Sequence, residues 1–165
     1  METNTRWVTV AGNDEGEGAR GRSPGASGLT ILLAEDDEAM RRFLYDELSA
    51  DGNVVVTACD GIEVLETLGG VSKLPFLPPD VMVMDVRMPG YSGLHVLAAL
   101  RSAQWSTPVI LITAFGDERV HEEGTRLGAV AVFDKPLDID DLRTALRNLD
   151  HRVDKSAHPA RTSGE

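Results

Sequence analysis

Carboxylates, one hydroxyl and one ammonium group follow a series of short apolar segments in this chain of 165 residues. They are Glu35 and Asp36 after LTILLA, Asp85 at the end of VMVMD, Thr113 at the end of PVILIT, and Lys135 shortly after AVAVF. If these ends meet, the carboxylates repel one another by about 4 kcal/mol for a close pair at an effective dielectric near 20. A hard divalent cation, Mg²⁺ or Mn²⁺, relieves such repulsion because it prefers oxygen ligands.

This set of side chains suits phosphoryl transfer. The carboxylate of Asp85 can act as a nucleophile and form an aspartyl phosphate. A cation and Lys135 would neutralise the oxygens of the moving group, and the hydroxyl of Thr113 would donate to another oxygen. The acids after LTILLA also fit a solvated turn at the start of a helix, where carboxylates are favoured. The hypothesis therefore depends on the elements that carry these residues.

Strands that alternate with helices are predicted to position the site. The strands are apolar on both faces, as is typical of buried parallel strands. Such a series predicts an α/β fold, a doubly wound parallel sheet with helices on both faces, in which ligands bind beyond the carboxyl ends of the strands. The predicted strands are 29–34, 53–58, 81–85, 108–113 and 129–133, and the predicted helices are 38–50, 61–69, 93–103, 117–127 and 138–149.

Helical spacing also predicts which side chains are buried in the first and last of these helices. Helix 138–149 begins at Asp138 as a capping residue. The expected buried set is Met40, Phe43, Leu44 and Leu48 in helix 38–50, and Leu142, Ala145, Leu146 and Leu149 in helix 138–149.

Charge and glycine content divide the chain into one domain and two tails. Residues 29–150 hold 21 acidic and 10 basic side chains, a net charge of −11. This excess repels phosphate backbones, so we expect no nucleic-acid binding, and it favours a cation or a basic partner. Residues 1–28, with six glycines, and residues 151–165 are predicted to be flexible tails around a domain at 29–150.

Several classes of protein are disfavoured by what the sequence lacks. Its longest apolar runs have five residues, whereas a membrane span needs about 20, so we expect no membrane insertion. The chain shows no secretory leader pattern, and Cys59 is its only cysteine, which excludes an internal disulfide. A cytoplasmic protein is therefore expected.

Four segments resemble the receiver domains of two-component response regulators. They are ILLAEDDEAMRRFL, VMVMDVRMPGYSGLHVL, PVILITAFGD and GAVAVFDKPLDIDDL, and the resemblance extends over residues 29 to about 149. It implies a flavodoxin-like fold with five helices and strand order 2-1-3-4-5. It also implies that Asp85 accepts a phosphoryl group from a histidine kinase or a histidine phosphotransfer protein.

The resemblance assigns roles to the other residues of the site. It implies that Glu35, Asp36, Asp85 and the backbone carbonyl of Arg87 bind Mg²⁺. It implies further that the phosphoryl group is bound by Thr113, the switch hydroxyl, by Ala114 and by Lys135, and that Pro136 follows a cis peptide bond.

The sequence departs from the family pattern at three places, namely position 132, the connection 69–79, and the residues after 150, which are too few for an output domain. Val132 stands where the family usually has an aromatic switch residue, and Phe133 is expected on the opposite face of the strand. Arg87 and Phe115 are expected beside the path of the attacking water, and the apolar Phe115 predicts slow self-dephosphorylation. The connection 69–79 is longer than usual and contains three prolines.

The predicted function is a stand-alone phosphorylation switch with no separate substrate turnover, because the residues after 150 are too few for an output domain. Phosphorylation would alter a protein-binding face formed by helix 117–127, strand 129–133 and helix 138–149. A phosphorelay intermediate and a scaffold that works without phosphorylation are the alternatives. A haloacid-dehalogenase-type phosphatase is disfavoured because Arg87 occupies the place of its second acid. The downstream partner and homodimerisation are left open.

Overall fold

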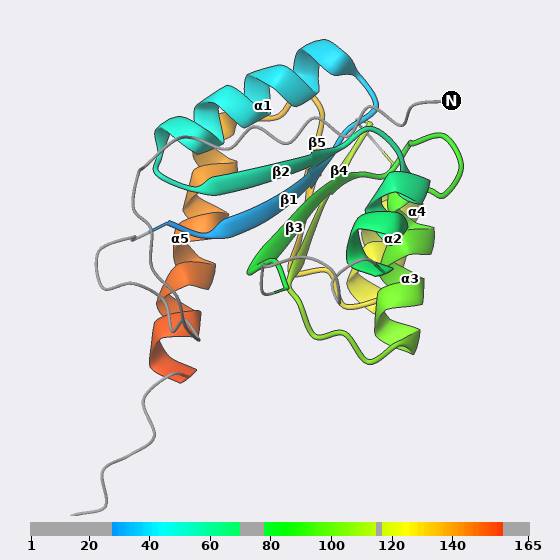
Figure 1. Cartoon of the computed structure of the whole chain (residues 1–165). Helices are drawn as coiled ribbons and strands as arrows, with labels where there is room; N and C mark the ends of the chain where they lie inside the picture. Colours follow the sequence, from blue (N-terminus) through cyan, green and yellow to red (C-terminus); the bar gives the residue numbers. More distant parts are fainter. Residues whose placement is uncertain (1–27, 70–77, 115–116, 157–165) are drawn as a thin grey trace, which may run out of the picture.

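The computed structural model describes residues 28–69, 78–114 and 117–156. Within these ranges the chain alternates strictly between strands and helices (Figure 1). The elements are β1 (Thr30–Ala34), α1 (Glu38–Ala50), β2 (Val54–Ala58), α2 (Gly61–Gly69), β3 (Val81–Asp85), α3 (Gly93–Ser102), β4 (Val109–Thr113), α4 (Glu118–Arg126), β5 (Ala131–Asp134) and α5 (Ile139–Ser156).

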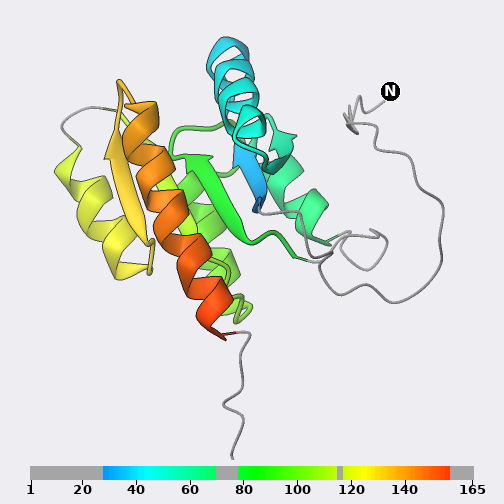
Figure 2. The same cartoon turned by 90° about the vertical axis from the view of Figure 1, so that its left-hand side faces the viewer.

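All strand pairs are parallel and the sheet order is β2-β1-β3-β4-β5, which confirms the predicted topology. Helices α1 and α5 cover one face of the sheet, and α2, α3 and α4 cover the other (Figures 1 and 2). The order reverses at β1, so that β1 and β3 lie side by side in the middle of the sheet. The carboxyl ends of β1 and β3 therefore lie next to each other. In sheets of this kind, ligands bind beyond the carboxyl ends of the strands where the strand order reverses.

Alternate residues of the central strands enter two separate apolar cores. Leu32 and Met82 pack on the side of α2 and α3, whereas Ile31 and Val83 pack on the side of α1 and α5. Every residue of β3 and β4 is buried. The edge strands differ from the prediction of burial on both faces, since Val54 in β2 is 58% exposed. An edge strand has a neighbour on one side only, which the composition of a short apolar run does not reveal.

Polar side chains fix where the helices begin. Asp37 accepts a hydrogen bond from the backbone N–H of Met40 and caps α1. Asp138 accepts one from the N–H of Asp140 at the start of α5, as predicted. The cap satisfies donors that the first helical turn leaves unpaired.

Two details of the helices correct the predictions. Phe43 is 45% exposed, whereas Leu44 and Leu48 are fully buried. The buried face of α1 is narrower than its apolar spacing suggests, because the sheet contacts only one side of the helix. Helix α5 ends at Ser156 and not at residue 149. Its backbone hydrogen bonding continues into charged residues, where an apolar pattern gives no signal.

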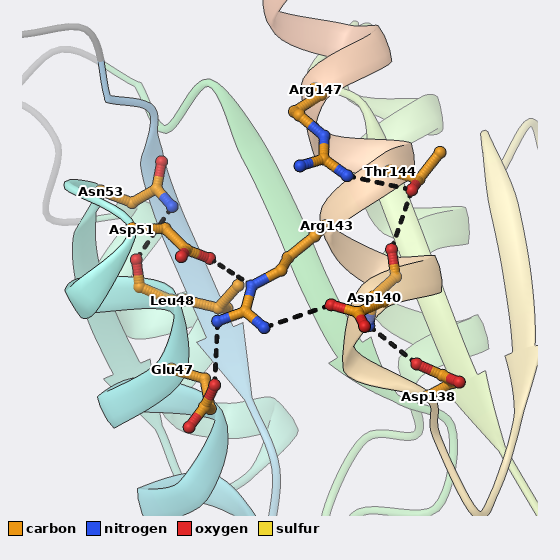
Figure 3. Close-up of polar contacts among 9 residues, drawn as sticks. All are labelled: Glu47, Leu48, Asp51, Asn53, Asp138, Asp140, Arg143, Thr144 and Arg147. Carbon is orange, nitrogen blue, oxygen red and sulfur yellow. Dashed lines mark hydrogen bonds and ion pairs between the residues drawn. The ribbon is translucent and has the colours of Figure 1, made fainter.

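An arginine links α5 to the C-terminal end of α1 (Figure 3). The Arg143 guanidinium donates to Asp51 Oδ2 at 2.7 Å and to Glu47 Oε2 at 2.9 Å. Its third contact, at 3.4 Å, is with Asp140 on its own helix. The link joins two helices that pack on the same core and on the same face of the sheet.

None of the described helices is long and apolar enough to cross a membrane. Predictions for residues 1–27, 70–77, 115–116 and 157–165 lie outside the described residues. These include most of both tails, the centre of the proline-containing connection, and Phe115.

Candidate functional site

The predicted site residues lie at the carboxyl edge of the sheet. Glu35 follows β1, Asp85 is the last residue of β3, Thr113 is the last residue of β4, and Lys135 follows β5. The parallel register aligns these ends, because Ala34 pairs with Met84 and Thr113 pairs with Asp134. Four chain segments far apart in sequence therefore deliver their polar ends to one place.

Lys135 contacts two buried carboxylates. Its Nζ lies 2.7 Å from Asp85 Oδ2 and 3.1 Å from Glu35 Oε2. The side chains of Glu35 and Asp85 are 1% and 5% exposed, whereas that of Lys135 is 32% exposed. When both carboxylates are ionised, one cation therefore faces two negative charges withdrawn from water.

The electrostatic effect of this arrangement is strongest at Glu35. Burial, together with the charge of Asp85, raises the pKa of Glu35 to about 7. For Lys135, burial lowers the pKa of the ammonium group, but hydrogen bonds and charges from Asp85 and Glu35 outweigh this and raise it. The ammonium group therefore stays charged, while the carboxylates favour a further cation.

Three carboxylates form a group that could hold a metal ion. One oxygen each of Glu35, Asp36 and Asp85 lie within 4.8 Å of one another, and Asp36 is exposed at the surface. An all-oxygen donor set with one side open to water suits Mg²⁺ or Mn²⁺, which keep several water ligands. These residues fit the predicted cation on donor chemistry and on uncompensated charge.

Backbone groups hold the two buried carboxylates in place. The N–H of Asp37 donates to Glu35 Oε1 at 3.1 Å, and the N–H of Arg87 donates to Asp85 Oδ1 at 2.9 Å. The guanidinium of Arg41 in α1 donates to the carbonyl of Glu35 at 2.7 Å. Sequence reasoning did not identify Arg41, although an arginine one turn into the helix after the acidic pair is a signal that could have found it.

The hydroxyl of Thr113 is buried and has no hydrogen-bond partner among the described residues. The carbonyl of the same residue accepts a hydrogen bond from the N–H of Lys135 at 2.7 Å. The next residue, Ala114, is half-buried. The Lys135–Pro136 peptide bond is cis, as predicted.

Val132 and Phe133 lie on opposite faces of β5, as predicted. Val132 packs against the core that contains Leu111, and Phe133 packs against the core that contains Ile112. Helix α4 comes very close to Val132, since a Cβ built on Gly124 would lie 3.1 Å from Val132 Cγ2. Val132 therefore packs directly against α4.

Arg87, predicted beside the site, directs its guanidinium toward the start of α4. It lies 3.9 Å from Asp117 Oδ2 and is 73% exposed. Such an exposed pair contributes little to stability. The predicted role of its backbone carbonyl as a metal ligand stays a prediction.

Comparison with known proteins agrees with this geometry. The family model for the response regulator receiver domain matches residues 31–147. The chain belongs to the response regulator receiver domain family. The predicted family and fold are thereby confirmed, and the chain is placed in two-component or phosphorelay signalling.

Curated relatives include proteins of different lengths. The chain is 32% identical over 157 residues to the transcriptional regulatory protein TcrA of Mycobacterium tuberculosis, covering 92% of this chain and 60% of TcrA. It is 36% identical over 117 residues to the Regulator of RpoS of Escherichia coli, covering 70% of this chain and 33% of that protein. The sporulation initiation phosphotransferase F of Bacillus subtilis is 30% identical over 117 residues, covering 71% of this chain and 90% of the relative. The chain thus spans only part of its larger relatives.

Solved structures show the same fold. A receiver domain of the Francisella response regulator 1452 matches with a TM-score of 0.69 and 28% identity, covering 76% of this chain and 99% of that one. The chemotaxis response regulator CheY4 of Vibrio cholerae matches with a TM-score of 0.62 and 28% identity, covering 74% and 98%.

Proposed function

We propose that this chain is a phosphorylation switch whose phosphoacceptor is Asp85. The observation that carries the proposal is the buried Asp85 carboxylate, held 2.7 Å from an ammonium group and grouped with two further acids. An isolated buried pair of acids is unfavourable, so an arrangement of this kind is typical of a site built for cationic and phosphoryl ligands.

In the proposed reaction, the Asp85 carboxylate attacks the phosphorus of a phosphohistidine on a histidine kinase or phosphotransfer protein. An O–P bond forms to Asp85, the N–P bond breaks, and the departing imidazole keeps the electron pair. Bound Mg²⁺, held by Glu35, Asp36, Asp85 and the Arg87 carbonyl, would neutralise charge on the phosphoryl oxygens. Lys135 supplies a second positive charge, and the N–H of Arg87 keeps the attacking carboxylate oriented.

Thr113 is proposed to sense the product. A buried hydroxyl without a partner costs about 1–3 kcal/mol, and donation to a phosphoryl oxygen would remove that penalty. The bound phosphoryl group thereby favours a different arrangement at the end of β4. Such a shift would pass to the face formed by α4, β5 and α5, which we propose binds a downstream protein.

We further propose that the domain at 29–150 works in the cytoplasm as a switch without turnover of a separate substrate. A phosphorelay intermediate is the second candidate, because the phosphotransferase from Bacillus subtilis is matched over 90% of its length. Transfer from the phosphorylated chain to a histidine phosphotransfer protein would distinguish the two.

Labelling with acetyl phosphate tests the phosphoacceptor. Intact-mass spectrometry of the wild-type chain in Mg²⁺ should show addition of one phosphoryl group, which EDTA prevents. Asp85→Asn should show none, whereas Asp46→Asn, at an exposed position on α1, should be labelled like the wild type. Labelling of Asp85→Asn at the wild-type rate would refute the assignment, and a wild-type chain that no donor labels would favour the scaffold alternative.

A further inference from the structure

Helix α4 is linked to the end of β5 by a histidine and an aspartate. Nε2 of His121 lies 2.8 Å from Oδ1 of Asp134, and each side chain is 38% exposed. A carboxylate can only accept, so Nε2 carries the hydrogen in this contact. The link is therefore a short hydrogen bond to a charged acceptor, partly shielded from water.

Asp134 stands between the two residues proposed to bind the phosphoryl group. It pairs in register with Thr113 across the sheet, and it immediately precedes Lys135. The N–H of Lys135 donates to the carbonyl of Thr113. A displacement of the Asp134 side chain would therefore also displace the backbone that carries Thr113 and Lys135.

Alternation along β5 explains why this contact reaches α4. The side chains of Val132 and Asp134 lie on the same face, since successive strand residues alternate. That face is covered by α4, which lies beside β5 in Figure 2 and approaches Val132 closely at Gly124. The polar link and the apolar contact therefore hold the same helix against the same strand.

The link is present together with an unpartnered Thr113 hydroxyl. Under the proposed function, that hydroxyl gains a phosphoryl oxygen as its partner once Asp85 is phosphorylated. We propose that the His121–Asp134 hydrogen bond is a restraint that favours the unphosphorylated position of α4. This inference rests on the proposed function and adds to it the residues that set the switching equilibrium.

Thermodynamic coupling gives the sign of the effect. If the restraint stabilises the inactive position, its removal raises the fraction of chains able to accept a phosphoryl mimic. The mimic then binds more tightly. Hydrogen bonds to charged groups are stronger than neutral ones when buried, but both side chains here are 38% exposed, so we expect roughly a fivefold change in the equilibrium constant.

The test is a titration with beryllofluoride in Mg²⁺, followed by amide NMR shifts. His121→Ala should bind about fivefold more tightly than the wild type, and its α4 amide shifts without the mimic should lie nearer the bound values. His121→Gln, which retains a donor near Nε2, should behave like the wild type. Glu122→Ala, at an exposed position on α4, is the matched control and should also leave the affinity unchanged.

A double-mutant comparison distinguishes loss of the His121–Asp134 bond from a general disturbance of α4 by the substitution. In an Asp134→Ala background, His121→Ala should cause no further gain in affinity, because the partner is already absent. Wild-type affinity in His121→Ala, or a loss of affinity in place of a gain, would overturn the restraint while leaving the phosphoacceptor intact. A wild-type chain that shows no saturable response to the mimic would instead overturn the proposed function, and the restraint with it.

Discussion

Lys135 Nζ lies 2.7 Å from Asp85 Oδ2, although 50 residues separate them in the chain. The same nitrogen also lies 3.1 Å from Glu35 Oε2, so a single ammonium group serves two buried carboxylates. This contact links stability to function, because the cation that stabilises the fold is the one proposed to meet the phosphoryl oxygens.

Replacement of Lys135 tests that link. Lys135→Ala leaves Glu35 and Asp85 buried without their cation, and in EDTA it should lower the free energy of unfolding by about 1–3 kcal/mol, allowing for the partial exposure of the lysine. Urea unfolding measures this. Arg126→Ala, which removes the surface pair with Glu123, is the control and should have a smaller effect. An equal loss in both variants would show that the buried Lys135 contacts contribute no more to stability than an exposed ion pair.

Lys135→Ala should also separate phosphorylation from switching. We expect Asp85 in this variant to accept phosphate slowly from acetyl phosphate, while the α4 amide shifts that accompany phosphorylation in the wild type are reduced. Mass spectrometry and NMR on the same sample measure the two effects. Full α4 shifts in the phosphorylated variant would contradict the role given to the lysine.

Mg²⁺ should stabilise the folded chain. At a free Mg²⁺ concentration ten times the dissociation constant, the free energy of unfolding should rise by about 1.4 kcal/mol relative to EDTA. Asp36→Asn should remove most of this gain, because one of the three grouped carboxylates is lost. Asp37→Asn is the matched control. The side chain of Asp37 accepts a hydrogen bond from the N–H of Met40 and caps α1, and asparagine can also cap a helix. If Asp37→Asn abolishes the gain and Asp36→Asn does not, the metal ligands have been misassigned.

Gly93 is predicted to be required for the geometry of Asp85. A Cβ at position 93 would lie 2.5 Å from the Asp85 carbonyl oxygen, so Gly93→Ala must displace the backbone that carries the phosphoacceptor. We expect a loss of about 1–3 kcal/mol in unfolding free energy, together with slower labelling by acetyl phosphate. Gly69→Ala, where a Cβ meets nothing within 4 Å, should be neutral or slightly stabilising. Equal effects at the two positions in thermal unfolding would contradict this account.

The thiol of Cys59 should react slowly although it is exposed. A hydrogen bond to Glu63, burial and nearby acidic charges raise the pKa of Cys59 to about 11, so little thiolate is present at pH 8. Alkylation by iodoacetamide at pH 8 should be about tenfold slower than for a free cysteine, because greater nucleophilicity offsets part of the lower thiolate fraction. Glu63→Gln should accelerate the reaction, and Glu66→Gln, on the same helix, should not. An unchanged rate in Glu63→Gln would mean that the glutamate does not hold the thiol protonated.

Local pattern was sufficient for the elements and for their order along the chain, whereas the order of the strands in the sheet followed from the family resemblance. Short apolar runs such as VMVMD predict buried strands, and strands that alternate with helices permit few topologies, because parallel crossovers have one hand. The polar residues that end these runs could therefore be assigned to one edge of the sheet. Asp85 and Thr113 are where that reasoning places them.

Tertiary packing decided what local pattern does not encode. Phe43 has the spacing of a core residue, yet 45% of it is exposed because α1 meets the sheet along a narrow stripe. The exposure of Val54 follows from the place of β2 at the sheet edge, which depends on strand order and not on composition.

The sequence by itself determined which side chains reach the carboxyl edge, since this follows from periodicity along each segment. Only the tertiary structure decided which of them touch. Three features depend on how separate segments pack: Lys135 bonds both carboxylates, the Thr113 hydroxyl lacks a partner among the described residues, and His121 bonds Asp134. A hydrogen bond is set by tenths of an ångström, which packing of the whole domain fixes and residue spacing does not.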